Sequence, residues 1–151
     1  MKSLIICKSI HHHNTERVAR VMGEILDAPI MEPDHFDAGT LSEYDLIGFG
    51  SGIYFARHHA SLLDLVDSLP CLDKKVFIFS TRGIGPVRIY HGPLRRRLLK
   101  KGFTIVGEFS CKGHDTIGLL GFIGGINKSS PRESDLERAH TFAETLKDSC
   151  V

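Results

Sequence analysis

Short apolar runs alternate along this chain with stretches whose apolar residues recur at helical spacing. The clearest helical stretch has Val18, Val21, Met22 and Ile25 at positions i, i+3, i+4 and i+7, which form one face of a helix. The apolar runs between such stretches have the length of strands buried on both faces. This alternation is typical of βαβ units around a parallel sheet, so we predict an α/β fold.

The same pattern predicts where the individual elements lie. Strands are expected at residues 2–8, near Ile30, and at residues 45–50, 75–80 and 104–111. Helices are expected at residues 14–26, in a stretch that ends before Pro70, at residues 90–101, and in a last stretch carrying Leu136, Ala139, Ala143 and Leu146 on one face.

The 151 residues are enough for one compact core, so we expect a single domain spanning residues 1–151. No stretch has the roughly 18 apolar residues of a membrane span, and the first residues are too short for a signal peptide. We therefore expect a cytoplasmic protein. Its four cysteines are widely separated, with no C-x-x-C pair, and we expect them to be reduced and mostly buried.

Residues 112–131 interrupt the regular pattern with five glycines and no clear period. Loops of this length inside a compact domain are usually functional or mobile. The segment is also rich in apolar side chains, which favours packing over the sheet end or over a ligand there. A split fifth strand followed by a connection is an equal alternative.

Polar residues crowd the stretch that joins the first strand to the first helix. It contains Ser9, three consecutive histidines, Asn14, Thr15 and Glu16. Unpaired N–H groups and the helix dipole favour an anion at a helix start, so we predict a phosphate site there. The alternative is that Ser9, Asn14 or Thr15 only caps the helix.

Several other phosphate-binding classes do not fit this sequence. The P-loop pattern G-x-x-x-x-G-K-[ST] is absent, and the glycines at 48, 50 and 52 follow the third strand with the wrong spacing for a dinucleotide fold. A cysteine phosphatase would need an arginine where His13 stands after Cys7. A response-regulator receiver would need an acidic pair where Lys8 and Ser9 stand.

Three segments together resemble the flavin loops of flavodoxins. The stretch from Ser9 to Glu16 resembles the Ser/Thr-x-Thr-Gly-x-Thr phosphate loop, although it is one residue longer and has histidines in place of threonine and glycine. Residues 45–55 resemble the second flavin loop, and residues 80–83 the third. The resemblance implies a single-domain, short-chain flavodoxin-like doubly wound sandwich, with a five-stranded parallel sheet in the order 2-1-3-4-5.

The same resemblance implies a flavin mononucleotide (FMN) site. Ser9, Ile10, His11, His13, Asn14 and Thr15 would hold the phosphate, while Gly52, Ile53, Tyr54 and Phe55 would flank one side of the isoalloxazine ring. Ser80, Thr81, Arg82 and Gly83 would contact its other edge, and Tyr90 is a second stacking candidate with an equally good alternative role in packing. No catalytic residue and no metal ligand is assigned.

Metal and nucleic-acid binding are weaker alternatives. His11 to His13 and the pair His58–His59 place five imidazoles in two loops, but adjacent residues rarely share one metal ion. Arg95–Arg97 and Lys100–Lys101 are expected to form a solvated helix face, and a nucleic-acid role would need a wider basic surface.

Two functions agree with a flavin site. The chain is either a one-electron carrier between redox proteins or an FMN-dependent oxidoreductase acting on a small substrate such as a quinone or porphyrinogen. The sequence shows no obvious general acid or base and no separate nicotinamide domain, which favours the carrier. Electron-carrying flavodoxins are typically acidic, whereas this chain has a net charge of +1, so its redox partner is not indicated.

Overall fold

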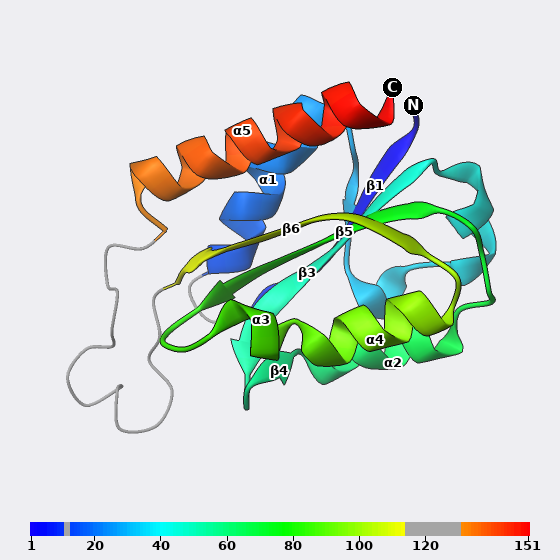
Figure 1. The fold of residues 1–151 in the computed structure, drawn as a ribbon, viewed down its shortest axis with the longest axis horizontal. Coiled ribbons are helices and arrows are strands. Elements are labelled where there is room, and N and C mark those ends of the chain that lie inside the picture. Colours follow the sequence, from blue (N-terminus) through cyan, green and yellow to red (C-terminus); the bar gives the residue numbers. More distant parts are fainter. Residues whose placement is uncertain (11–12, 114–130) are drawn as a thin grey trace.

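A twisted parallel sheet forms the centre of the molecule (Figure 1). The computed structural model describes residues 1–10, 13–113 and 131–151. The parallel strands are β1 (Ser3–Lys8), β2 (Ile30–Met31), β3 (Leu46–Tyr54), β5 (Lys75–Arg82) and β6 (Thr104–Lys112), in the order β2-β1-β3-β5-β6. This confirms the predicted five-stranded order 2-1-3-4-5. The structure adds one short strand, β4 (Arg57–His58), which pairs antiparallel with the end of β3.

Helices cover both faces of the sheet. α1 (Asn14–Leu26) and α5 (Glu133–Cys150) lie on one face, and α2 (Ala60–Ser68), α3 (Val87–Tyr90) and α4 (Gly92–Lys100) on the other (Figure 1). Two 3-10 helices, Pro33–His35 and Ala38–Glu43, connect β2 to β3. Side chains alternate along each strand, so the sheet contributes to two separate apolar cores, one under each helical layer. Of the described helices, none is both long and apolar enough to cross a membrane.

Three predicted boundaries were wrong. The third strand continues past residue 50 to Tyr54, and the fourth past residue 80 to Arg82, because their polar ends still pair with neighbouring strands. The helix expected at residues 90–101 is two helices that meet at His91. Pro93 stands in the first turn of α4, where proline is tolerated because that turn's N–H groups have no helical partner.

The glycines of β3 have a packing role. Gly48 lies opposite Phe77 in the β3–β5 register, and Gly50 lies opposite Phe79. A Cβ atom on Gly48 or Gly50 would lie 2.3 Å from the facing phenylalanine ring. The absence of a side chain on β3 therefore lets two aromatic rings lie across the centre of the sheet, which accounts for these glycines without a dinucleotide.

All four thiols are free, but the prediction that they are mostly buried was only half right. Cys7 and Cys111 are buried, Cys150 is half-buried and Cys71 is exposed. Burial raises the pKa of Cys111 to about 12 and raises that of Cys7 as well, so both thiols stay protonated near neutral pH. A thiolate nucleophile at Cys7 is thereby disfavoured.

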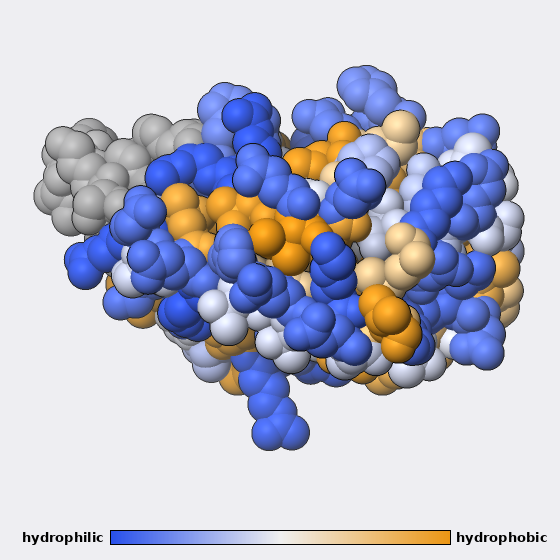
Figure 2. Space-filling view, turned by 90° about the horizontal axis from the view of Figure 1, so that it is seen from above, coloured by the Kyte–Doolittle hydropathy of each residue, from blue (hydrophilic) through white to orange (hydrophobic). Residues whose placement is uncertain are grey.

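The face covered by α1 and α5 is largely hydrophilic, with an apolar patch near its middle (Figure 2). Beside α5 lies a hollow lined by Phe109 and Phe142 among polar side chains. The alternatives for residues 112–131 concern mainly residues 114–130, which lie outside the described residues.

Candidate functional site

Three connecting loops leave the sheet at its carboxyl edge. Lys8 at the end of β1 is in register with Ser51, Ser51 with Ser80, and Thr81 with Cys111. The loops that follow β1, β3 and β5 therefore begin side by side. In an open α/β sheet this edge, next to the point where the strand order reverses, is where ligands bind. The predicted site residues that the structure describes belong to these three loops or to the strand ends and helix starts beside them.

The first loop enters α1 through a left-handed residue. His13 has φ 52° at the N-cap position and makes no side-chain cap. Its Nδ1 atom instead lies 2.9 Å from Oε2 of Glu16. The Ser9 hydroxyl accepts the backbone N–H of Glu16 at 3.2 Å, so Ser9 caps one amide of the first turn, as the simpler alternative predicted. His11 lies outside the described residues, and Ile10 is exposed at the loop's edge.

A buried hydrogen bond joins the first loop to the third. The hydroxyls of Thr15 and Thr81 are 2.7 Å apart, and both residues are buried. The end of β6 completes this contact, since a Cβ atom on Gly113 would lie 2.9 Å from the Asn14 amide nitrogen and 3.1 Å from Cβ of Thr81. Thr15, predicted to hold the phosphate, and Thr81, predicted to contact the edge of the ring, therefore also join the first and third loops.

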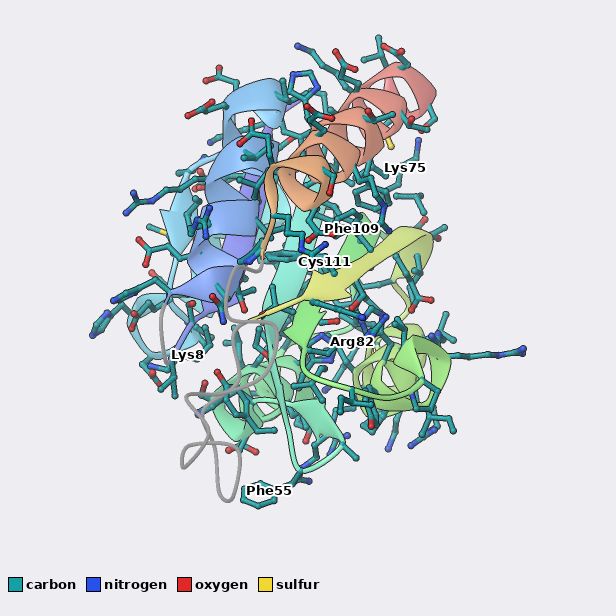
Figure 3. All side chains as sticks on the ribbon, turned by 90° about the vertical axis from the view of Figure 1, so that its left-hand side faces the viewer. Lys8, Phe55, Lys75, Arg82, Phe109 and Cys111 are labelled. Carbon is teal, nitrogen blue, oxygen red and sulfur yellow. The ribbon has the colours of Figure 1, made fainter. Side chains whose placement is uncertain are left out.

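The second loop is a tight hairpin. Ile53 and Tyr54 pair with His58 and Arg57, and the turn residues Phe55 and Ala56 have φ angles of 51° and 63°. Positive φ at both central positions is the pattern of a type I′ turn, whose twist matches that of the two strands. Phe55 stands at the tip, and Figure 3 shows its ring pointing away from the sheet.

The Tyr54 side chain lies between the first and second loops. Its ring lies over Gly52, where a Cβ atom would be 2.6 Å from the tyrosine oxygen. Its hydroxyl donates to the carbonyl of Ile10 at 3.4 Å, and its ring meets the ring of His59 edge-on at 5.4 Å. The structure therefore brings Tyr54 and the first loop together, as a shared ligand site requires.

Ser80 does not reach the surface of the candidate site. It is fully buried, and its hydroxyl lies 2.7 Å from Nε2 of His91 and 2.8 Å from the Ser110 hydroxyl. The predicted contact of Ser80 with a ligand has no support in this arrangement. Ser80 instead belongs to a buried polar cluster on the α2–α4 face of the sheet.

Two histidines, His58 and His91, complete that cluster, and no sequence pattern predicted either of them there. Nε2 of His58 donates to the Phe79 carbonyl at 3.1 Å, and the rings of His58 and His91 are 5.0 Å apart. Burial lowers the pKa of His58 to about 3 and that of His91 to about 4, so both are neutral near pH 7. The one sequence signal for a structural role of these histidines was the position of His91 at a helix start.

The third loop places Arg82 beside this cluster. Arg82 is half-buried at the end of β5, where Figure 3 shows it, and its Nε atom is buried with no hydrogen-bond partner among the described residues. Its carbonyl accepts the N–H of Gly113 at 2.9 Å. Gly83, half-buried, continues the loop toward Gly85, which has φ 120°.

Tyr90 closes the third loop. Its hydroxyl donates to the Ile84 carbonyl at 3.0 Å, and a Cβ atom on Gly85 would overlap the tyrosine oxygen. The packing role considered for Tyr90 is therefore the one that the structure supports.

A metal centre has no support in the part of the chain that the structure describes. Those residues contain no group of three or more histidine, cysteine or acidic side chains arranged to hold an ion. His59 accepts the Ser61 N–H at the start of α2, and His58 bonds the Phe79 carbonyl. Both imidazoles thus have structural roles, while His11 and His12 lie outside the described residues.

Comparison with known proteins gives a close relative in sequence and many in fold. No family model matches the chain. It is 46% identical to the uncharacterized protein MJ0298 of Methanocaldococcus jannaschii over 147 residues, which are 97% of this chain and 98% of that protein. It also resembles oxidised flavodoxin 2 from Bacillus cereus, with a TM-score of 0.74 and 20% identity over 99% of both chains.

A second structural relative is a larger protein. Rubredoxin oxygen:oxidoreductase from Desulfovibrio gigas matches with a TM-score of 0.74 and 18% identity, over 99% of this chain and 36% of that one. At these identities the structural likenesses establish the fold. The chain therefore belongs to the same family as the Methanocaldococcus jannaschii protein, and its fold is that of the flavodoxins.

Proposed function

We propose that this protein binds FMN at the carboxyl edge of its sheet and acts as a one-electron carrier between redox proteins. The observation that carries the proposal is the convergence of the loops after β1, β3 and β5 beside the start of α1. Thr15 and Thr81 join the first loop to the third, and the Tyr54 hydroxyl joins the second loop to the first. The side chain of the N-cap residue, His13, does not cap α1, and a helix start of this kind is a favourable place for a phosphate.

The residues at this edge fit the parts of FMN. Backbone N–H groups of the first turn of α1, beside Asn14 and Thr15, would hold the phosphate, with Ser9 fixing the loop through Glu16. Tyr54 of the hairpin would flank one side of the ring. The loop from Thr81 to Gly83 would border its other edge. When bound, the isoalloxazine supplies the ability to take up and release electrons one at a time.

Two histidines near this edge have structural roles and are not available to exchange protons with a substrate near neutral pH. His58 and His91 are buried, held neutral, and bonded to the Phe79 carbonyl and the Ser80 hydroxyl. The alternative is an FMN-dependent oxidoreductase that acts on a quinone or porphyrinogen, and it draws on Arg57, Arg82 and Arg88 near the same edge.

Fluorescence titration of the flavin-free protein with FMN and with riboflavin tests the binding proposal. We expect FMN to bind about tenfold more tightly or better, because only FMN places a phosphate at the α1 start. Asn14→Asp should weaken FMN binding and leave riboflavin binding unchanged. Ser134→Asp, which adds the same charge at the start of α5, is the control and should change neither. Equal affinities for the two flavins would refute the phosphate site.

Steady-state assays of the FMN-loaded protein separate the two functions. A carrier should pass electrons rapidly to a one-electron acceptor such as cytochrome c and show no saturable turnover with quinones. Saturable quinone reduction at a rate matching or exceeding cytochrome reduction would favour the oxidoreductase.

A further inference from the structure

Large apolar side chains are exposed on the second and third loops. Phe55 is 95% exposed at the hairpin tip, Ile84 is 74% exposed in the loop after β5, and Ile89 is 65% exposed in α3. The hairpin strand β4 contacts both α3 and α4, so these side chains stand on neighbouring elements at the carboxyl edge. Single exposed apolar residues are ordinary, but several that share one edge mark an interaction surface.

The conformation of the hairpin tip points the same way. Phe55 and Ala56 both adopt the left-handed region, which is unfavourable for residues with a side chain and is usually left to glycine or asparagine. Phe55 gains no packing inside the protein in return, because nearly all of its surface faces solvent. Folding therefore does not explain a phenylalanine at this position, whereas contact with another molecule does.

The segment that carries Ile84 and Ile89 is strongly basic. Residues 82–101 contain seven arginines and lysines and no acidic residue, although the whole chain has a net charge of only +1. Arg95 pairs with Glu108 and Arg97 with Asp67. Among the described residues, no carboxylate pairs with the exposed side chains of Arg57, Arg88 or Arg96.

We infer that Phe55, Ile84 and Ile89, together with Arg57, Arg88 and Arg96, form a docking surface for an acidic redox protein. The arginines attract an acidic partner, and the apolar side chains are buried against it on contact. The aliphatic isoleucines argue against single-stranded nucleic acid, which is bound by stacking bases on aromatic rings. The charge is the reverse of that expected for an acidic electron carrier.

This inference rests on the proposed function, because the docking surface adjoins the loops assigned to the flavin ring. A partner bound there would have its own redox centre close to that ring. Each encounter would transfer one electron from the partner's reduced iron–sulfur centre to the bound flavin, so that the partner is oxidised by one electron. No covalent bond is formed or broken.

Stopped-flow reduction of the FMN-loaded protein by a reduced, acidic [2Fe–2S] ferredoxin of the plant type tests the inference. The second-order rate should fall as salt rises, as for oppositely charged partners. The double variant Arg57→Glu/Arg88→Glu should lower the second-order rate of reduction about tenfold or more at low salt. The control Lys75→Glu/Lys147→Glu makes the same change in net charge near the other end of the sheet and should have much less effect.

The apolar contribution is tested with a second pair of variants. Phe55→Ser should slow the reaction at both low and high salt, while Leu99→Ser, which removes an exposed apolar side chain from the end of α4, should not. FMN affinity is measured for every variant. If FMN binds normally and the arginine and control variants react equally fast, the docking inference is wrong while the proposed function stands.

The docking inference is also wrong if an oligodeoxythymidine binds this surface in an Arg57- and Arg88-dependent manner while the rate of reduction by ferredoxin does not depend on either residue. Absence of FMN binding by the unaltered protein would refute the proposed function instead. Titration of the flavin-free protein with oxidised ferredoxin, followed by amide NMR shifts around Arg57 and Ile89, then still tests the docking surface by itself.

Discussion

The imidazole rings of His58 and His91 lie 5.0 Å apart, one bonded to the Phe79 carbonyl and the other to the Ser80 hydroxyl. Both are buried and neutral, and Glu108, Arg82 and Arg95 are the charged groups that act on the pair. Oε1 of Glu108 is 3.7 Å from Nδ1 of His91, close enough to stabilise a proton there but not to offset the burial.

This pair predicts a loss of stability in mild acid. Burial lowers the pKa of His91 from 6.5 to about 4. Between these pH values the imidazole is protonated in the unfolded chain and neutral in the folded chain. The free energy of unfolding should therefore decrease as the pH falls from about 6.5 to about 4, by roughly 3 kcal/mol from His91. Urea unfolding across this range measures it. His91→Gln should reduce this decrease without abolishing it, because the buried His58 remains, and the exposed-residue control His140→Gln should leave it unchanged.

A methyl group at Gly50 should disrupt the sheet. The new Cβ atom would lie 2.3 Å from the Phe79 ring, so Gly50→Ala should lower the free energy of unfolding by about 1–3 kcal/mol or more. Gly39→Ala in an exposed 3-10 helix is the control. Phe79→Leu should restore part of the loss in the Gly50→Ala background. An undiminished unfolding midpoint in urea for Gly50→Ala would contradict this packing of the Phe79 ring against β3.

The Thr15–Thr81 hydrogen bond should be detectable by a double-mutant cycle. Each single change to valine leaves a buried hydroxyl without its partner and should lower the free energy of unfolding by about 1–3 kcal/mol. The double variant should lose less than the sum, since both hydroxyls are then gone. Thr104→Val, at an exposed position of β6, is the control. Strict additivity would mean that the two hydroxyls do not interact.

Arg82 should raise the midpoint potential of the bound flavin more than Arg57 or Arg88. Electron uptake puts negative charge on the ring, and a half-buried guanidinium is less screened by solvent than an exposed one. Arg82→Gln should lower the potential by on the order of tens of millivolts, from a charge about 8 Å away at an effective dielectric near 20. Redox titration of Arg57→Gln and Arg88→Gln provides the comparison, and equal shifts for all three would refute the assignment.

The positions of most elements could be predicted from the sequence because each rests on a local pattern. The helix expected at residues 14–26 is α1 with the same bounds, and the strand order follows from the flavodoxin resemblance. Errors occurred where pairing partners decide an element's end. β3 and β5 extend through polar residues because neighbouring strands and β4 satisfy their backbone groups there.

The sequence by itself determined the alternating architecture, the three loops and their polar residue types, since these depend on periodicity and on composition near strand ends. Only the tertiary structure decided which of those residues face a ligand. Ser80 and Thr81 are adjacent in sequence, yet Ser80 turns to His91 on one face of the sheet and Thr81 to Thr15 on the other. Successive side chains of a strand point to opposite faces of the sheet. The residues that each side chain contacts there come from helices in distant parts of the chain.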